Sequence, residues 1–330
     1  MSASSDPRLD IPPAWEAAAT EILQRGRCTV LAIGGSDVGK SSFCRYLAEA
    51  LARQSEVVLI DADIGQANIG PPATISLARV SVPVDFAATT PAAYFFVGST
   101  NPMGRLLPLV IGTANLAHEA SAAFIVINTT GLIHETGRVL KNYKIEAVRP
   151  DVIVALERRN ELAPIRAANR HAHIIRLTPS RAARSKDDYE KIEARARAYA
   201  RHFAKASRVE LPLDALAFQR TLLFTGRQLA QEGAVHAEQT AEGLLIVGAC
   251  DRAPAGSKVL PVGFEHNLLC GVADETGRCR GLGIIDHIDF SSRALSLTTA
   301  VASDQAKILQ FGDLYVTPNG SELGQVKWGW

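Results

Sequence analysis

The feature that most constrains this chain is the stretch GGSDVGKS, Gly34 to Ser41, which fits the phosphate-binding pattern G-x-x-x-x-G-K-[ST]. It stands between the apolar run CTVLAI and the helical pattern SSFCRYLAEALA. A strand that delivers a glycine-rich turn to the start of a helix directs backbone N–H groups and the positive end of the helix dipole at one point, where phosphate binds. The stretch therefore predicts a nucleotide site.

The residue types within this phosphate loop suit a nucleoside triphosphate. Gly34 and Gly39 let the turn curl around phosphate oxygens, and Lys40 bridges the β- and γ-phosphates as a point charge. The hydroxyl of Ser41 is a ligand for the accompanying magnesium. The predicted nucleotide contacts are the whole loop and the residue after it, namely Gly34, Gly35, Ser36, Asp37, Val38, Gly39, Lys40, Ser41 and Ser42.

The rest of the first half alternates apolar and helical runs. Helical spacing of apolar positions occurs in residues 103–120, 135–148 and 160–170. The apolar runs are rich in β-branched residues, as parallel strands covered on both faces require. The pattern predicts a doubly wound, mainly parallel α/β sheet of the P-loop NTPase type. Its expected strands lie in residues 28–33, 56–63, 92–98, 122–130, 151–157 and 173–178.

Three segments are expected along the chain. Residues 1–25 form a polar leader and a short amphipathic helix, and residues 26–209 form the P-loop domain. Within that domain, residues 180–207 are rich in basic side chains and predict a mobile helical lid, for which a solvated surface helix is the alternative. Residues 210–330 predict a small β-rich domain, with strands such as GLGIIDHIDF and ALSLTTAV.

Composition limits the possible partners and compartment. The 35 basic residues nearly balance the 34 acidic ones, so a nucleic acid would have to meet a local basic patch. The cysteines, at positions 28, 44, 250, 270 and 279, form no C-x-x-C pair and are expected to be reduced thiols. With no signal-peptide pattern and no apolar segment of membrane-spanning length, we expect a cytoplasmic protein without a membrane partner, and the oligomeric state stays open.

Two carboxylates follow the second predicted strand. Asp61 and Asp63 lie in LIDADIGQ, and the alternation of strand side chains places them on one side, at the strand end that faces the phosphate loop. Both are candidates to organise magnesium or its waters, and Asp63, which opens the turn, is the candidate base for an attacking hydroxyl. Gln66 is expected to orient phosphate or acceptor. Acidic residues that merely cap a turn are the alternative.

A further strand ends in INTTGLIHETG. In the usual sheet order of this class, Thr129, Thr130 and Gly131 form a turn beside the phosphate loop. Small hydroxyl residues there suit substrate contacts, although turn formation alone also explains them.

Taken together, these motifs resemble the polynucleotide 5′-hydroxyl kinases related to the RNA kinase subunit of the pre-mRNA cleavage complex, especially their archaeal and bacterial single-subunit forms. The loop with Asp37 is similar to that family's G-x-x-D-x-G-K-[ST]. DADIGQ, from Asp61 to Gln66, is similar to its D-x-D-x-G-Q turn, and NTTG, from Asn128 to Gly131, is similar to its T-x-G clasp. The similarity covers nearly the whole chain.

The resemblance implies transfer of the γ-phosphate of ATP, with Mg²⁺, to the 5′-hydroxyl end of RNA or DNA. It implies catalytic roles for Lys40 and Asp63, and an arginine-bearing lid in which Arg181 and Arg184 match. A guanidinium on the γ-phosphate stabilises the charge that spreads over its oxygens in the transition state.

One position departs from the resemblance. Many members place a tryptophan directly after the T-x-G glycine, and this chain has Leu132, which packs against a base without the aromatic stacking worth about 1 to 3 kcal/mol per base. This difference affects the affinity for the acceptor and the choice of RNA over DNA. The residues expected to bind the acceptor are Gln66, Thr129, Thr130, Gly131 and Leu132. Two alternatives stay open: an ATP-bound scaffold for RNA processing with little or no turnover, and a P-loop ATPase or kinase that acts on another substrate.

Overall fold

The computed structural model describes residues 10–86, 88–249 and 253–326. The chain forms two compact units, Met1–Arg195 and Ala196–Trp330. They divide inside helix α6 (Asp188–Phe203), upstream of the boundary expected at residues 209/210. The polar leader up to residue 9, and Cys250 among the cysteines, lie outside the described residues.

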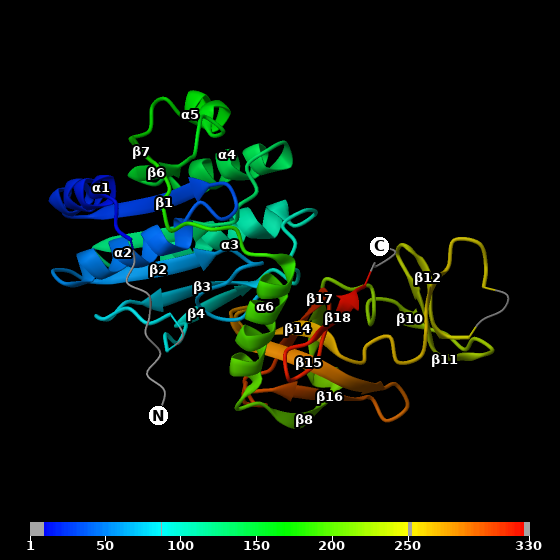
Figure 1. The fold of residues 1–330 in the computed structure, drawn as a ribbon. Coiled ribbons are helices and arrows are strands. Elements are labelled where there is room, and N and C mark those ends of the chain that lie inside the picture. The colour runs from blue at the N-terminus through cyan, green and yellow to red at the C-terminus, as the bar shows by residue number, and fades with distance from the viewer. Residues whose placement is uncertain (1–9, 87, 250–252, 327–330) are drawn as a thin grey trace. The chain divides into compact units, whose positions relative to one another are not determined.

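The N-terminal unit has a central sheet in the order β4-β3-β2-β5-β1-β6-β7 (Figure 1). Strands β2, β5, β1, β6 and β7 run parallel, whereas β3 is antiparallel to both of its neighbours. The described residues of β2, β5 and β6 are buried along their whole length, which explains their continuous apolar runs. The strands are β1 (Cys28–Gly34), β2 (Val57–Ala62), β3 (Thr74–Arg79), β4 (Ala93–Phe96), β5 (Phe124–Thr129), β6 (Val152–Leu156) and β7 (Ile174–Leu177).

Strand β3 was not among the predicted strands. Its sequence, TISLAR, alternates apolar residues with Thr74 and Ser76, so it lacks a continuous apolar run. Both hydroxyls are nevertheless buried, and they satisfy each other at 3.1 Å while Thr74 Oγ1 also donates to Pro71 O. Local hydrogen bonding of this kind hides a buried strand from a pattern based on hydrophobicity.

Helices cover both faces of this sheet, which confirms the doubly wound fold (Figure 1). On one face Trp15 packs edge-on against Phe43, with ring centroids 5.3 Å apart, and both join the core beneath β1 and β5. On the other face Leu109 and Leu140 pack onto the sheet with Ile33. The helices are α1 (Pro13–Gln24), α2 (Lys40–Ala52), α3 (Leu106–Glu119), α4 (Thr136–Val148) and α5 (Ala163–Ala168).

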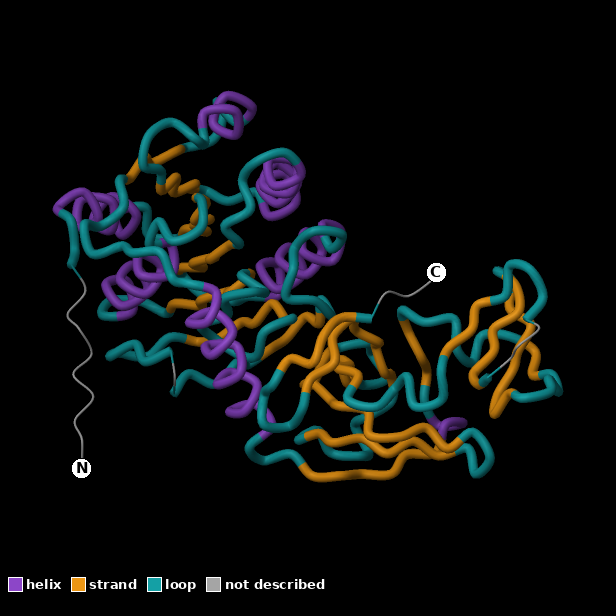
Figure 2. The backbone as a smooth tube through the Cα atoms, turned by 45° about the vertical axis from the view of Figure 1, so that its right-hand side comes forward, coloured by secondary structure: helices purple, strands orange, loops and turns teal. Residues whose placement is uncertain are grey.

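The C-terminal unit is mainly antiparallel β-structure, as Figure 2 shows by its strands. Strands β18-β17-β14-β15-β16-β8 lie in this order, β9 pairs with β17, and β10-β11-β12-β13 form a second sheet. A short helix, η1 (Leu213–Ala215), follows β8. The strands are β8 (Ser207–Pro212), β9 (Ala217–Gln219), β10 (Arg227–Gln228), β11 (Ala234–Thr240), β12 (Gly243–Gly248), β13 (Lys258–Leu260), β14 (Leu268–Ala273), β15 (Cys279–Asp289), β16 (Ala294–Thr299), β17 (Ile308–Val316) and β18 (Glu322–Gln325).

The basic segment 180–207 is helical only in part. Residues 181 and 182 form a turn and residues 183–187 are irregular, α6 begins at Asp188 and ends at Phe203, and β8 begins at Ser207. The described cysteines, Cys28, Cys44, Cys270 and Cys279, are buried thiols. None of the helices in the described residues is long and apolar enough to cross a membrane.

Candidate active site

The phosphate loop connects β1 to α2. Gly39 has φ +85° and precedes the first residue of the helix, Lys40, so the N-terminus of α2 faces the loop. Lys40 is 5% exposed, and its Nζ donates a hydrogen bond to Gly35 O at 2.6 Å. Burial lowers the pKa of Lys40, and the nearby carboxylates of Asp63 and Asp37 act in the opposite direction. The loop is thus folded around its own lysine, as a phosphate cradle requires.

Asp61 lies beneath the loop and joins it to two asparagines. Its carboxylate accepts hydrogen bonds from Asn68 N at 2.6 Å, from Asn128 Nδ2 at 2.9 Å and, at longer range, from Asp63 N, Ile69 N and the Asn68 amide. The same two amides donate to Ser41 Oγ, at 3.0 Å from Asn68 and 3.2 Å from Asn128. Burial, followed by the charge of Asp63, raises the pKa of Asp61 to about 6.

Asp63 and Gln66 occupy a different position, in the turn after β2. Strand β2 ends at Ala62, and Asp63 Oδ1 accepts from Gly65 N at 3.3 Å and from Gln66 N at 3.2 Å. Asp63 and Gln66 line a cavity in front of the phosphate loop, whereas Asp61 is not among the described residues that line it. The two predicted metal-binding carboxylates therefore differ: Asp63 faces the cavity, and Asp61 supports the residues around it.

The T-x-G turn lies where the sheet order predicted it, because β5 pairs with β1 on one side and β2 on the other. A Cβ atom on Gly131 would lie 2.3 Å from Ser36 Oγ and 2.7 Å from Ser36 N, so the turn touches the phosphate loop. Gly131 lines the cavity. Thr129, Thr130 and Leu132 do not belong to its described lining, and both threonines are buried.

The threonine hydroxyls are used inside the protein. Thr129 Oγ1 donates to Ala32 O of β1 at 2.8 Å. Lys141, fully buried on α4, donates to Thr129 Oγ1 at 3.0 Å, to Thr130 O at 2.6 Å and to Thr130 Oγ1 at 3.2 Å. Lys141 therefore fixes the turn from behind.

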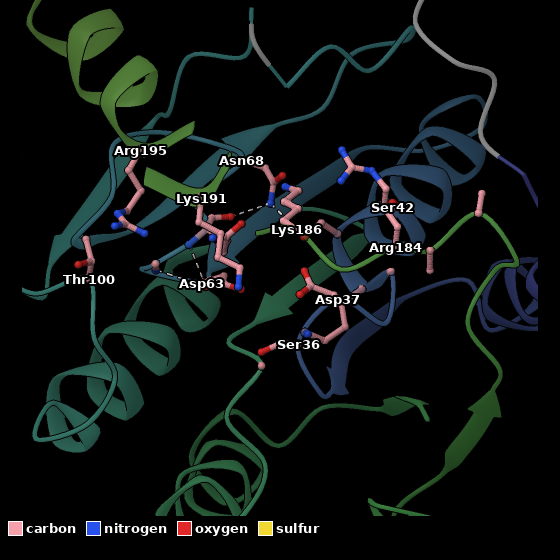
Figure 3. Close-up of a pocket in the computed structure, with 18 residues that line it drawn as sticks. Ser36, Asp37, Ser42, Asp63, Asn68, Thr100, Arg184, Lys186, Lys191 and Arg195 are labelled. Atoms are coloured by element: carbon pink, nitrogen blue, oxygen red, sulfur yellow. Dashed lines mark hydrogen bonds between the residues drawn. The ribbon is translucent and has the colours of Figure 1, made fainter. Parts of the chain in front are cut away.

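The lid segment supplies most of the positive charge around the cavity (Figure 3). Arg184 lines it, but its guanidinium is held by Glu190, with hydrogen bonds of 2.9 and 2.6 Å. Arg181 is exposed and is not among the described lining residues. Lys186, Lys191 and Arg195 line the cavity instead.

Sequence reasoning missed several of these positions. Lys191 and Arg195 are four residues apart on α6 and so share a helix face, a spacing that could have singled them out. Asn128 is the last polar residue before the T-x-G turn, whereas no sequence signal marked Asn68 or Thr100, which also lines the cavity.

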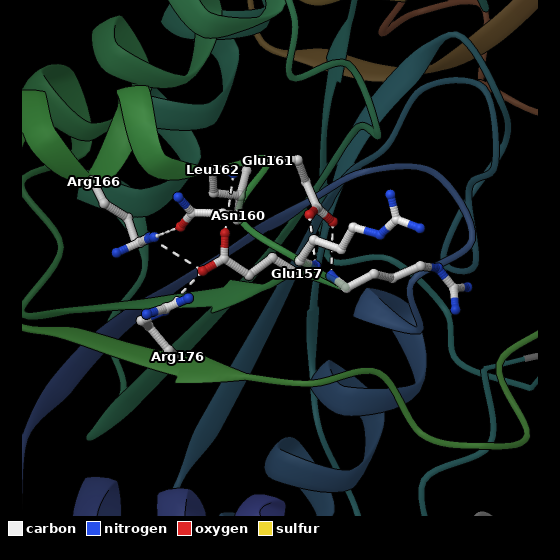
Figure 4. Close-up of polar contacts among 8 residues, drawn as sticks. Glu157, Asn160, Glu161, Leu162, Arg166 and Arg176 are labelled. Carbon is white, nitrogen blue, oxygen red and sulfur yellow. Dashed lines mark hydrogen bonds and ion pairs between the residues drawn. The ribbon is translucent and has the colours of Figure 1, made fainter.

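Ion pairs and hydrogen bonds hold the loop after β6, which forms a wall next to the phosphate loop (Figure 4). Buried Glu157 pairs with Arg176 Nε at 2.8 Å and Arg166 Nε at 3.2 Å and accepts from Leu162 N at 3.1 Å. Glu161 accepts from two backbone N–H groups of the same loop. Arg158 Nη2 then donates to Asp37 O at 3.0 Å, which connects this wall to the phosphate loop.

The cavity has the size and charge for a polyphosphate. Its volume is about 490 Å³, within the range of small-molecule sites. Its described lining includes five cationic side chains, Lys40 and four from the lid, and two carboxylates, those of Asp37 and Asp63. This excess of positive charge and the helix N-terminus fit the triphosphate of ATP.

The donor set also fits magnesium. Ser41 Oγ and the carboxylate of Asp63 are hard oxygen donors, and Asn128 Oδ1 is a buried oxygen for which the described residues provide no hydrogen-bond donor. The described residues hold no cluster of three or more His, Cys, Asp or Glu side chains that would bind a metal on its own. Magnesium typically binds through one or two protein oxygens and the phosphates of its nucleotide, which agrees with this sparse set.

Known proteins share both the motifs and the fold. The family model for the P-loop of the mRNA cleavage and polyadenylation factor CLP1 matches residues 34–205. A polyribonucleotide 5′-hydroxyl-kinase of Pyrococcus furiosus is 33% identical over 338 residues, which cover 96% of this chain and 95% of that protein. One from Methanocaldococcus jannaschii is 31% identical over 321 residues, 89% of each chain.

A solved structure of a Clp1p–Pcf11p complex is similar with a TM-score of 0.64 at 12% identity, covering 91% of this chain and 78% of that one, and thus shows the same fold. These matches confirm the resemblance that the three motifs indicated. On the family model and on the archaeal relatives that match along nearly its whole length, the chain belongs to the CLP1 P-loop family.

Proposed function

We propose that the protein is an ATP-dependent polynucleotide 5′-hydroxyl kinase, which transfers the γ-phosphate of ATP to the 5′-hydroxyl end of RNA or DNA. The observation that carries the proposal is the shared cavity: the phosphate loop, the Asp63 carboxylate and the lid cations all line it. The archaeal relatives, named polyribonucleotide 5′-hydroxyl-kinases, support a polynucleotide acceptor.

In this proposal the phosphate loop and Lys40 bind the β- and γ-phosphates. The 5′-hydroxyl oxygen forms a bond to the γ-phosphorus while the bond from that phosphorus to the bridging oxygen breaks, and ADP leaves with the electron pair. Asp63 accepts the hydroxyl proton. Its Oδ1 is occupied by two backbone N–H groups, which orients the carboxylate in the cavity.

The neighbouring residues complete this arrangement. Gln66 positions the acceptor, and Gly131 lets the T-x-G turn approach the phosphates, with Thr129, Thr130 and Leu132 shaping the turn behind it. Ser41, with Asp63 or Asp61, would hold magnesium, which would offset the charge of the β- and γ-phosphates. Arg184 is the lid residue proposed for the γ-phosphate, and it must first exchange its contact with Glu190. Lys186 and Lys191 add positive charge to the same wall.

Label transfer from γ-³²P-ATP to 5′-hydroxyl RNA and DNA of identical sequence tests the function. We expect transfer by the unaltered protein, and loss of transfer with retained ATP binding in Asp63→Asn. Asp304→Asn, at an exposed position of the C-terminal unit, is the matched control. If the protein transfers label to neither RNA nor DNA, at any magnesium or manganese concentration, the proposal is refuted.

Label transfer, together with measurements of ATP binding and ATP consumption, separates the two alternatives. An ATP-bound scaffold, suggested by Leu132 in place of tryptophan, predicts ATP binding without transfer in the unaltered protein. An ATPase or kinase for another substrate predicts ATP consumption that single-stranded oligonucleotide does not stimulate, whereas the proposed kinase predicts stimulation that falls with salt.

A further inference from the structure

A loop on the far side of Asp63 forms part of the cavity wall. It connects β4 to α3, and Thr100 in this loop lines the cavity. A Cβ atom on Gly65 would lie 2.8 Å from Thr100 O, so the loop packs directly against the turn that carries Asp63 and Gln66. The position of Thr100 is therefore tied to that of the proposed base.

The loop is also held by its own hydrogen bonds. Gly98 N donates to Ala73 O at 3.1 Å, Asn101 N to Ser99 Oγ at 3.2 Å and Met103 N to Asn101 Oδ1 at 3.0 Å. Ser99 is buried, whereas Thr100 is partly exposed. The backbone on both sides of Thr100 is thus held by hydrogen bonds, which suits a binding contact.

Arg195 lines the same cavity as Thr100. It is the second cavity-lining cation on α6, one turn after Lys191, and Figure 3 shows its guanidinium extending toward Thr100. In that view the pair is well separated from Ser36 and Asp37 of the phosphate loop, with Asp63 between the two ends. The cavity therefore has a phosphate-loop end and a second basic end, joined at Asp63.

The geometry of phosphoryl transfer indicates what the second basic end of the cavity could bind. The attacking oxygen approaches the γ-phosphorus from the side opposite to the departing ADP, so the acceptor extends away from the phosphate loop. With its 5′-oxygen at Asp63, the next charged group of a polynucleotide is the phosphodiester on the 3′-oxygen of the same sugar. An arginine and a threonine hydroxyl are typical phosphate ligands.

We infer that Arg195 and Thr100 form a subsite for the first phosphodiester of the acceptor, which distinguishes a polynucleotide from a nucleoside. The inference rests on the proposed kinase function. It assigns the lid two separate tasks: residues near the phosphate loop act on ATP, and Arg195 acts on the acceptor.

The test uses the full chain and two 5′-hydroxyl oligonucleotides of one sequence. One has normal phosphodiesters, and the other has an uncharged methylphosphonate at the first linkage. A charge-assisted contact predicts that the unaltered protein prefers the first by about ten- to a hundredfold in kcat/KM. Moving the methylphosphonate to the fourth linkage is expected to remove most of this preference.

Variants locate the contact. Arg195→Gln is expected to reduce the preference to less than about twofold and to flatten the salt dependence of kcat/KM by about 0.7 in a log-log plot. Thr100→Val should reduce the preference severalfold, and Thr100→Ser should restore it. Arg197→Gln, at an exposed position of α6 that is not part of the described cavity lining, should retain the full preference.

Each contrary outcome identifies what has failed. If the unaltered protein phosphorylates neither oligonucleotide, the kinase function and this inference both fail. If it phosphorylates both equally well, the kinase stands and the subsite is refuted. If Arg195→Gln instead raises the KM for ATP and leaves the preference intact, Arg195 belongs to the ATP side and the subsite is again refuted.

Discussion

Replacing Lys144 by methionine should stabilise the protein at neutral pH. Lys144 is fully buried on α4, three residues after Lys141, and the described residues place no hydrogen-bond partner within reach of its Nζ. Burial lowers its pKa from 10.5 to about 7, and the charges of Asp63 and Asp61 counteract this only in part. Methionine has a similar shape and removes the amine.

The size of the effect follows from the two pKa values. Between pH 7 and pH 10.5 the buried amine is neutral in the folded state and charged after unfolding, so unfolding takes up a proton and is favoured by acid. At 1.36 kcal/mol per pKa unit, this lowers the free energy of unfolding by about 4 kcal/mol at pH 7.5 and about 1.4 kcal/mol at pH 9.5. The advantage of Lys144→Met should therefore shrink by about 2.5 kcal/mol over this range.

Urea unfolding at pH 7.5, 8.5 and 9.5, followed by the helical circular dichroism signal, measures this difference. The matched control is Lys141→Met, which leaves Thr130 O and two hydroxyls without their donor at about 1 kcal/mol each, so it should be less stable than Lys144→Met by about 3 kcal/mol. A Lys144→Met variant that is less stable than the unaltered protein at pH 7.5, or whose advantage does not change with pH, would refute the reasoning.

Three further predictions concern the site itself. Gly131→Ala should lower ATP affinity tenfold or more in calorimetric titration, because its Cβ would lie 2.3 Å from Ser36 Oγ; unchanged affinity would contradict the contact. Glu190→Gln should lower the KM for ATP a few-fold by weakening its hold on Arg184, and a raised KM would instead show that the pair supports the lid. The pKa of Asp61 is raised to about 6, so its contribution to the free energy of unfolding falls as pH rises from about 4 to 6, by at most about 1.4 kcal/mol per pH unit. Asp61→Asn should lose this pH dependence in urea titrations. An equal dependence in both proteins would show that another group titrates.

The helices and parallel strands that hold the phosphate loop could be predicted from the sequence. Burial on both faces imposes continuous apolar runs such as FIVINT and VIVAL, and amphipathic helices repeat their apolar residues every three or four positions. Strand β3 was not predicted, because the buried hydroxyls of Thr74 and Ser76 form a hydrogen bond with each other. The spacing of apolar residues does not reveal such a bond.

Within the site, the residues of contiguous motifs were predictable and their partners from other elements were not. Asp63 and Gln66 stand in one turn beside the loop that a glycine pattern marks. Thr129 and Thr130 have the residue type for substrate contacts, but Lys141 on α4 engages their hydroxyls, and that pairing depends on how α4 packs on the sheet. Side-chain identity gave the chemistry available at these positions, whereas tertiary packing decided where it is used.

Buried Lys141 helps to explain how the proposed acceptor side of the site is held in place. Lys141 holds the T-x-G turn through Thr129 and Thr130, and the turn in turn abuts Ser36 at Gly131. On the other side, the Thr100 loop abuts, at Gly65, the turn that carries Asp63, the proposed base. The two close approaches place glycines where any side chain would separate the walls, so these contacts set how near the neighbouring walls of the cavity lie to one another. The lid, whose Arg184 is held by Glu190 at the surface, is then the part of the site that we expect to move in the proposed transfer.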